Sequence, residues 1–116
     1  MALRQDDVES VSDSVVEELD ALIIGAGVTG IYQLYCLREL GINARIYEAG
    51  SGVGGTWYWN RYPGARFDSE SYSYAYSFSE ELLADWNWKE HYSGQPENER
   101  YLNHVTDRFG LRDRIR

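Results

Sequence analysis

Three glycines at a fixed spacing are the residues of this sequence whose chemistry is easiest to infer. Gly25, Gly27 and Gly30 form G-x-G-x-x-G within the stretch D-A-L-I-I-G-A-G-V-T-G. The first glycine allows a tight turn, the second lets a pyrophosphate approach the backbone, and the third lets a helix pack closely on a strand. The phosphates would meet free N–H groups and the positive dipole end of the helix that starts at Val28. The spacing therefore predicts a dinucleotide site.

An acid further along the chain strengthens this prediction. Glu48 stands 18 residues after Gly30, close to where this fold places the carboxylate that binds the ribose hydroxyls of adenosine. A carboxylate there would repel a 2′-phosphate, so the first cofactor is expected to be FAD or NAD and not NADP. The alternative is a glycine turn that merely closes a parallel sheet, but such a turn would not require Glu48.

A βαβ unit must position these residues. The apolar run before Gly25 is typical of a short buried strand, and a second strand is expected to end at Glu48. Between them, Gly41 ends a helix in the position that favours a left-handed residue. The predicted strands are 21–24 and 43–48, the predicted helix is 28–40, and its apolar stripe is Ile31, Leu34, Leu37 and Leu40, widened by Tyr35.

The loop 49–68 is the second candidate region. At 20 residues it is longer than ordinary connections, which favours a functional loop or disorder, and its aromatic density argues against disorder. Four glycines precede the aromatic run, which predicts a second backbone cradle followed by a flat-sided pocket. The glycines are Gly50, Gly52, Gly54 and Gly55, and the aromatic residues are Trp57, Tyr58 and Trp59.

The rest of the chain is interpreted as packing elements. Residues 69–79 are expected to be an extended segment with Tyr72, Tyr74 and Tyr76 on one side, the first and last of them packed. Ser79 is expected to cap a helix over 80–86, and Pro96 to begin a helix that runs to Phe109. The apolar stripe predicted for the last helix is Tyr101, Leu102, Val105 and Phe109, and Trp86 and Trp88 are predicted core or interface anchors.

Composition and charge set limits on function. The net charge is −8, and residues 1–20 account for −6 of it, with seven acids and Arg4. The chain is therefore divided into an acidic leader, 1–19, predicted to be disordered or else a partner-binding helix, and a domain, 20–116, that is nearly balanced. A nucleic-acid surface is not expected. No membrane span or signal peptide is predicted, so a cytoplasmic location is expected.

Cysteine and histidine give no sign of a metal site. The single cysteine, Cys36, excludes an internal disulfide and is interpreted as a buried thiol inside the first helix. His91 and His104 are 13 residues apart, in unrelated elements, and are interpreted as structural or exposed.

From Asp20 to the C-terminus the sequence resembles the N-terminal FAD-binding region of Baeyer–Villiger monooxygenases, the cyclohexanone and phenylacetone monooxygenase family. The resemblance lies in G-A-G-V-T-G, in the acid of I-Y-E-A-G, and above all in G-G-T-W-Y-W-N-R-Y-P-G-A-R-F-D. This fifteen-residue block, Gly54 to Asp68, distinguishes the group from other flavoproteins with two dinucleotide domains. Phe67 departs from the pattern, since relatives often have a small residue or Cys there.

The resemblance implies an α/β fold, the N-terminal part of a Rossmann-like FAD-binding domain of the two-dinucleotide-binding flavoprotein type, followed by the aromatic-rich loop and short helices. It implies FAD and NADPH as cofactors. The implied reaction converts a ketone and O2 into an ester or lactone through a flavin C4a-peroxide. The residue types of the aromatic loop are compatible with this reaction, because an aromatic wall can keep water away from such a flavin adduct.

The same resemblance implies roles for individual residues. Asp68 is the candidate catalytic residue, suited to orienting a cation, with an N-cap or a surface ion pair as the alternative. For Arg61 and Arg66 two interpretations have equal weight, an ordinary salt bridge and a contact to the cofactor. The implied cofactor-binding residues are Gly25, Gly27, Val28 and Gly30 at the pyrophosphate, Glu48 at the ribose, Gly55, Thr56, Trp57, Tyr58 and Trp59 on the flavin side, Asp68 and Tyr74 near the isoalloxazine, and Arg66, Phe67 and Asp68 toward the nicotinamide.

Several parts of the family pattern are missing from this sequence. They are the second glycine motif for NADPH, the signature F-x-G-x-x-x-H-x-x-x-W and the arginine that partners Asp68. The chain is therefore interpreted as an N-terminal fragment of a longer enzyme, whose remaining domains would be its partners. The alternatives are an N- or S-oxygenating flavin monooxygenase and a non-catalytic, truncated dinucleotide-binding module.

Overall fold

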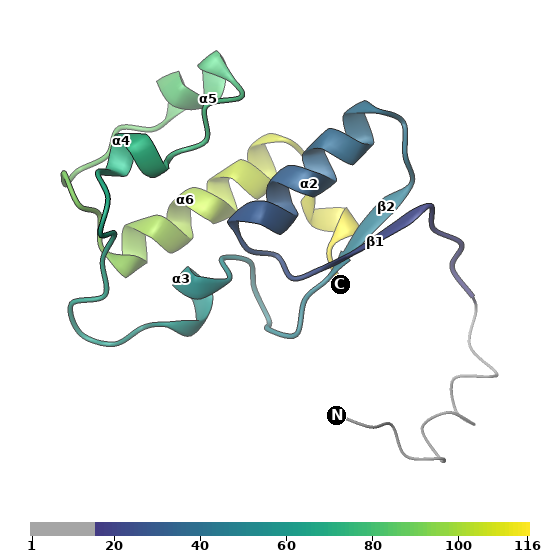
Figure 1. Cartoon of the computed structure of the whole chain (residues 1–116), viewed down its shortest axis with the longest axis horizontal. Coiled ribbons are helices and arrows are strands. Elements are labelled where there is room, and N and C mark those ends of the chain that lie inside the picture. Colours follow the sequence, from purple (N-terminus) through teal and green to yellow (C-terminus); the bar gives the residue numbers. More distant parts are fainter. Residues whose placement is uncertain (1–15) are drawn as a thin grey trace, which may run out of the picture.

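The computed structural model describes residues 16–116. The prediction that residues 1–19 are disordered is therefore not tested for residues 1–15, which are outside the described part. Within these residues the chain forms two strands and six helical elements (Figure 1): β1 Ala21–Ile24, α2 Val28–Glu39, β2 Ala44–Tyr47, α3 Thr56–Trp59, α4 Ser71–Tyr74, α5 Glu80–Asp85, α6 Gln95–Arg108 and the 3-10 helix η1 Arg112–Arg114.

The βαβ unit forms as predicted. β1 and β2 pair in parallel, from Ala21 opposite Ala44 to Ile24 opposite Tyr47, and α2 is the crossover helix between them. A third parallel segment begins at the end of the chain, where Ile115 forms a bridge with Ile46 and the backbone N–H of Arg116 donates to the Ile46 carbonyl (2.9 Å).

The apolar stripe of α2 is confirmed except at its last position. Ile31 and Leu34 are buried in the core, but Leu40 is 73% exposed. The helix ends at Glu39, and Gly41 takes a left-handed conformation (φ 73°) that turns the chain away. Leu40 is therefore beyond the last turn that packs on the strands.

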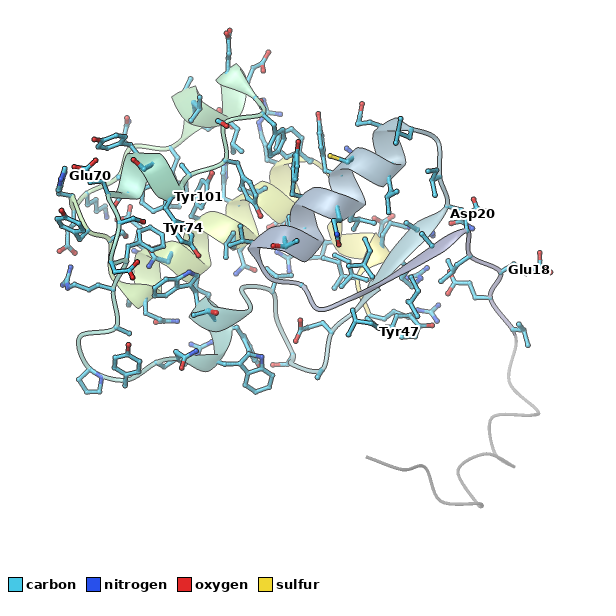
Figure 2. The ribbon with its side chains drawn as sticks, in the orientation of Figure 1. Glu18, Asp20, Tyr47, Glu70, Tyr74 and Tyr101 are labelled. Carbon is cyan, nitrogen blue, oxygen red and sulfur yellow. The ribbon has the colours of Figure 1, made fainter. Side chains whose placement is uncertain are left out.

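In the described part of the chain, a helix covers one face of the sheet and leaves the other face open. Leu22, Ile24 and Tyr47 point away from α2 and are 51%, 78% and 42% exposed. Figure 2 shows Tyr47 on the side of the strands opposite α2. Parallel sheets are normally covered on both faces, so this open face, defined by these three residues, is an unusual feature.

The extended segment predicted for 69–79 is wrong, because Ser71–Tyr74 form the short helix α4. The Ser71 N–H donates to the His91 carbonyl (2.8 Å), and its hydroxyl donates to the carbonyls of Glu90 and His91 (2.9 and 3.0 Å). This tertiary contact fixes a turn where the tyrosine alternation favoured a strand. Tyr72 consequently faces solvent (64% exposed), contrary to prediction, whereas Tyr76 is half-buried.

The last two helices and the tryptophans follow the predictions. Ser79 caps α5 by accepting the Leu82 N–H (3.2 Å), and α6 begins one residue before Pro96, with Tyr101, Leu102 and Val105 buried. The Trp86 and Trp88 rings pack against Tyr101 at 5.5 and 4.7 Å. Within residues 16–116 no helix is long and apolar enough to cross a membrane, and no group of side chains there could hold a metal ion.

Candidate dinucleotide-binding site

The first glycine loop continues the ladder between the strands and then starts α2. The Gly25 N–H donates to the Tyr47 carbonyl (2.9 Å), and Gly27 is the N-cap of α2 without a side-chain cap. The first N–H groups of a helix have no partner within it. At Gly30 an added Cβ would overlap the carbonyl oxygen of Gly25. The close packing predicted for the third glycine is therefore confirmed.

The second glycine loop lies directly on the first. The Gly54 N–H donates to the Ala26 carbonyl (2.9 Å). A Cβ on Gly55 would lie 2.8 Å from the Cα of Gly27, and Gly55 itself has a φ of 54°. At this crossing Gly55 has no room for a side chain, whereas a Cβ on Gly27 would lie 3.5 Å from the Cα of Gly55, an ordinary contact.

A hollow of about 420 Å³ opens where the two loops meet. None of the described residues that line it carries a charge, so an anion bound there would rely on backbone N–H groups and on the dipole of α2. The lining residues are Ile24, Gly25, Gly27, Val28, Thr29, Gly30, Gly54, Gly55, Thr56, Trp57 and Tyr74.

Aromatic side chains close one side of this hollow. The indole N–H of Trp57 donates to the Tyr74 hydroxyl (3.1 Å), and the Tyr74 ring stacks on Phe67 with centroids 3.9 Å apart. Trp57 meets Phe67 edge-on at 5.0 Å. Phe67 is thus a buried support behind the wall that Trp57 and Tyr74 form, which explains why this position holds a large apolar residue.

Glu48 lines a second hollow of about 280 Å³. Its carboxylate accepts the N–H of Ala26 (2.6 Å) and of Gly50 (2.8 Å). A carboxylate has about four lone-pair positions, so two remain for ribose hydroxyls. Glu48 therefore braces both glycine loops and still has capacity for a ligand. The lining residues are Glu48, Gly50, Ser51, Gly52, Val53, Arg112, Ile115 and Arg116.

The glycines of the second loop make room for a tyrosine of the same loop. A Cβ at Gly50 or Gly54 would lie 2.5 or 3.1 Å from Tyr58. The Tyr58 hydroxyl accepts the Ser51 N–H (3.0 Å) and lies 2.7 Å from the Ser51 hydroxyl. These hydrogen bonds lower the pKa of Tyr58. The predicted backbone cradle is therefore formed mainly around the protein's own ring.

The structure does not bring all the predicted flavin-side residues to the hollow. Thr56, Trp57 and Tyr74 line it, whereas Tyr58 packs on the second loop and Trp59 is 60% exposed. Their cofactor roles stay predictions.

The two arginines of the aromatic loop form ordinary ion pairs. Arg66 pairs with Glu90 (2.6 Å) and donates to the Tyr92 carbonyl (2.9 Å). Arg61 pairs with Glu99 (2.8 Å) and donates to the Tyr58 carbonyl (2.8 Å). Asp68 is exposed beside buried Phe67. Both arginines therefore form the ordinary salt bridges that were one of the two interpretations. The roles of Arg66 and Asp68 toward a cofactor stay predictions.

Sequence reasoning missed the arginines at the Glu48 end. Arg112 and Arg116 come into the site because the chain returns to the edge of β2 after α6. No local signal in the sequence indicated this, because the bridge between Ile115 and Ile46 joins segments that are far apart in the chain. Thr29, which lines the hollow between the two glycine loops, was also missed, whereas Gly54 belongs to the predicted second backbone cradle.

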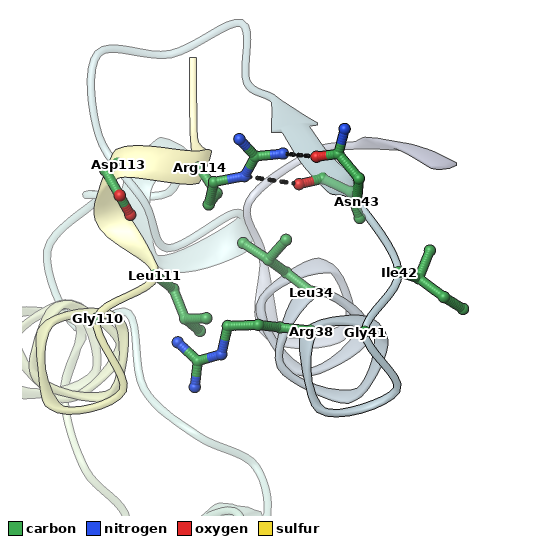
Figure 3. Close-up of a pocket in the computed structure, with 10 residues that line it drawn as sticks. Leu34, Arg38, Gly41, Ile42, Asn43, Gly110, Leu111, Asp113 and Arg114 are labelled. Atoms are coloured by element: carbon green, nitrogen blue, oxygen red, sulfur yellow. Dashed lines mark hydrogen bonds between the residues drawn. The ribbon is translucent and has the colours of Figure 1, made fainter. Parts of the chain in front are cut away.

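A third hollow of about 440 Å³ lies at the other end of α2. Figure 3 shows it between Leu34, Gly41 and Leu111, with Arg114 bonded to Asn43 at its rim. Ligands of parallel sheets bind beyond the carboxyl ends of the strands, and this hollow is at the amino end of β2. It is therefore not a candidate for the dinucleotide.

Comparison with known proteins agrees with this geometry. Residues 23–86 match the family described as NAD(P)-binding Rossmann-like domain. Acetone monooxygenase (methyl acetate-forming) of Gordonia sp. (strain TY-5) is 58% identical over 94 residues, which are 81% of this chain and 18% of that protein. A phenazine N-monooxygenase of Lysobacter antibioticus is 52% identical over 100 residues, or 85% of this chain and 18% of that protein.

Solved structures give the same result. The closed crystal structure of cyclohexanone monooxygenase matches with a TM-score of 0.85 and 47% identity, over 88% of this chain and 19% of that one. Another match, OTEMO, was solved in complex with FAD and NADP. These findings confirm the predicted fold class and the resemblance to Baeyer–Villiger monooxygenases. The chain spans about one fifth of the length of these proteins.

Proposed function

This chain belongs to the family of NAD(P)-binding Rossmann-like domains, and we propose that it forms the N-terminal FAD-binding part of a Baeyer–Villiger monooxygenase that converts a small ketone into an ester or lactone. The observation that carries the proposal is the crossing of Gly27 and Gly55 at the uncapped start of α2. Packing against Gly27 accounts for Gly55, but packing does not account for Gly27, whose Cβ would make only an ordinary contact. A group that needs direct access to the backbone accounts for Gly27, at a hollow where none of the described lining residues is charged.

The residues present fit FAD. The N–H groups at the start of α2 would hold the pyrophosphate, and the free lone pairs of Glu48 would hold the adenosine ribose. Trp57 and Tyr74 would form a wall that excludes water beside the flavin. FAD reduced by NADPH supplies the electrons with which O2 is activated. Arg66, Phe67 and Asp68 would face the nicotinamide side, and Asp68 would orient a cation from another part of the enzyme.

A cytoplasmic location and completion by further domains belong to the same proposal. Cys36 is a free thiol in the structure, which suits a reducing compartment. The open face of Leu22, Ile24 and Tyr47 suits cover by further parts of a larger enzyme.

Gly27→Ala in the full-length protein tests the cofactor site. A Cβ at Gly27 would lie 3.5 Å from the Cα of Gly55, an ordinary contact, and Gly27 has no left-handed φ. The fold should therefore survive, while the methyl group enters the space required by the pyrophosphate. We expect loss of most of the bound FAD, measured by flavin absorbance after gel filtration, with an unchanged melting temperature of the FAD-free protein.

Gly94→Ala is the matched control. Gly94 is also an extended glycine N-cap, with ordinary contacts at 3.8 Å, but it starts α6 outside the hollow. This variant should retain FAD. Equal retention by the Gly27 and Gly94 variants would contradict the proposed site.

N-oxygenation is a second candidate activity, favoured by the 52% identity to the phenazine N-monooxygenase. Product analysis separates the two. NADPH- and O2-dependent formation of an ester from a ketone supports the first, and an N-oxide from a nitrogen heteroaromatic compound without any ester supports the second.

A further inference from the structure

Two arginines stand at the end of the site where a carboxylate is expected to bind ribose. Arg112 and Arg116 line the hollow of Glu48. An arginine near the ribose acid is the feature by which this type of fold accepts a 2′-phosphate. The presence of two arginines conflicts with the expectation from Glu48 alone, which is that the site rejects a ribose carrying a 2′-phosphate.

Each guanidinium is paired with an acid that does not line this hollow. Arg112 donates to Asp107 (2.6 Å) and to the side-chain oxygen of Asn103 (2.9 Å). Arg116 pairs with the Oε2 of Glu17 (3.4 Å). Glu48 is therefore left as the acid that faces a ligand there.

Glu17 is built into the edge of the sheet. Its Oε1 accepts from the Nε of Arg45 (2.9 Å) and lies 2.8 Å from its Nη2, and Arg45 is a buried residue of β2. Hydrogen bonding to Arg45, with the charges of Arg116 and Arg114 nearby, lowers the pKa of Glu17. The carboxylate is therefore ionised at neutral pH, and two contacts to β2 hold it in place.

The backbone of Arg116 contacts Glu48, while its guanidinium pairs with Glu17. The Glu48 N–H donates to the Arg116 carbonyl (2.6 Å). The side chain is 61% exposed, so it has room to change its partner. The position of this one positive charge depends on Glu17.

We propose that Glu17 is a specificity-determining residue of the adenosine end, which keeps the Arg116 guanidinium from a 2′-phosphate and so restricts the site to FAD and other adenosine nucleotides without that phosphate. The inference rests on the proposed FAD site. It gives a function to the last part of the acidic leader.

Competition against FAD in the full-length apoprotein tests this. FAD binding is followed by flavin fluorescence, and 5′-AMP or adenosine 2′,5′-bisphosphate is added as competitor. Because the readout is displacement of FAD, binding at any separate NADPH site does not contribute. We expect Glu17→Gln to raise the affinity for the bisphosphate relative to 5′-AMP by about tenfold, as for one charge-assisted hydrogen bond.

Three further variants sharpen the result. Glu18→Gln removes the same charge from an exposed neighbour and should leave the ratio unchanged. Glu17→Gln with Arg116→Gln should return the ratio to that of the unmodified protein. Should Glu17→Gln fail to fold, Glu17→Asp keeps the charge but shortens the reach, and a smaller rise of the ratio is expected.

The outcomes separate the two proposals. If the protein binds FAD and the ratio does not change in the Glu17 variants, or changes equally in Glu18→Gln, or stays raised without Arg116, then this inference is overturned alone. If the unmodified protein fails to bind FAD, the proposed function falls and this inference falls with it.

Discussion

The two glycine loops of this chain use the same residue for different purposes. At the first loop, Gly30 in the first turn of α2 lets the Gly25 carbonyl approach the helix, and Gly27 leaves its backbone open to the hollow. In the second loop, Gly50 and Gly54 lie against the Tyr58 ring. A run of glycines therefore indicates close approach to the backbone, and what approaches must be found from the structure.

Gly30→Ala should have the largest effect. The new methyl group would overlap the Gly25 carbonyl. The methyl group is fixed to the backbone of α2 and the carbonyl belongs to the backbone after β1, so neither can move without separating α2 from β1. We expect destabilisation of more than about 3 kcal/mol, measured by denaturant unfolding of the FAD-free protein. A stability within error of the unmodified protein would mean that the first loop tolerates side chains, as flexible loops do.

Gly55→Ala should be the next most costly. It combines a left-handed φ of 54° with a Cβ only 2.8 Å from the Cα of Gly27. Destabilisation of about 2 kcal/mol is expected from backbone strain and crowding. Because the loops separate at their crossing, FAD retention should fall too. Normal FAD retention despite lower stability would show that the crossing matters to folding only.

Gly50→Ala tests whether Tyr58 is the reason for the second set of glycines. The added Cβ would lie 2.5 Å from the Tyr58 ring, and we expect a cost of about 1–2 kcal/mol. In a Tyr58→Ala background the same substitution should cost about 1 kcal/mol less, the coupling typical of touching residues. Additive costs in this double-mutant cycle would remove Tyr58 from the explanation.

Tyr58→Phe should have the smallest effect. The ring stays on the glycines, and the hydroxyl loses only its bonds to the N–H and side chain of Ser51. A loss of about 0.5–1 kcal/mol in unfolding free energy is expected, because the site is partly exposed to water. A loss as large as that for Gly55→Ala would mean that the hydroxyl, and not the ring, organises the second loop.

The βαβ unit could be predicted from the sequence because its signals are local. Gly25, Gly27 and Gly30 specify the backbone at their own positions, and Glu48 stands at the end of the next strand. The helix α4 could not be predicted, since Ser71 is held by carbonyls about twenty residues away. The ion pair of Arg116 with Glu17, and the approach of Arg112 to the hollow of Glu48, depend on where the chain returns to β2, which no local sequence pattern indicates.

The Ala26 peptide, which bonds to both Glu48 and the second glycine loop, is also a natural probe. Its N–H is bonded to Glu48 and its carbonyl to Gly54, and the residue is fully buried. Its amide proton should therefore exchange with deuterium far more slowly than those of the surrounding loop. Since the acceptor is the carboxylate proposed to bind ribose, the chemical shift of that one proton should change on nucleotide binding, which gives a direct NMR signal of occupancy.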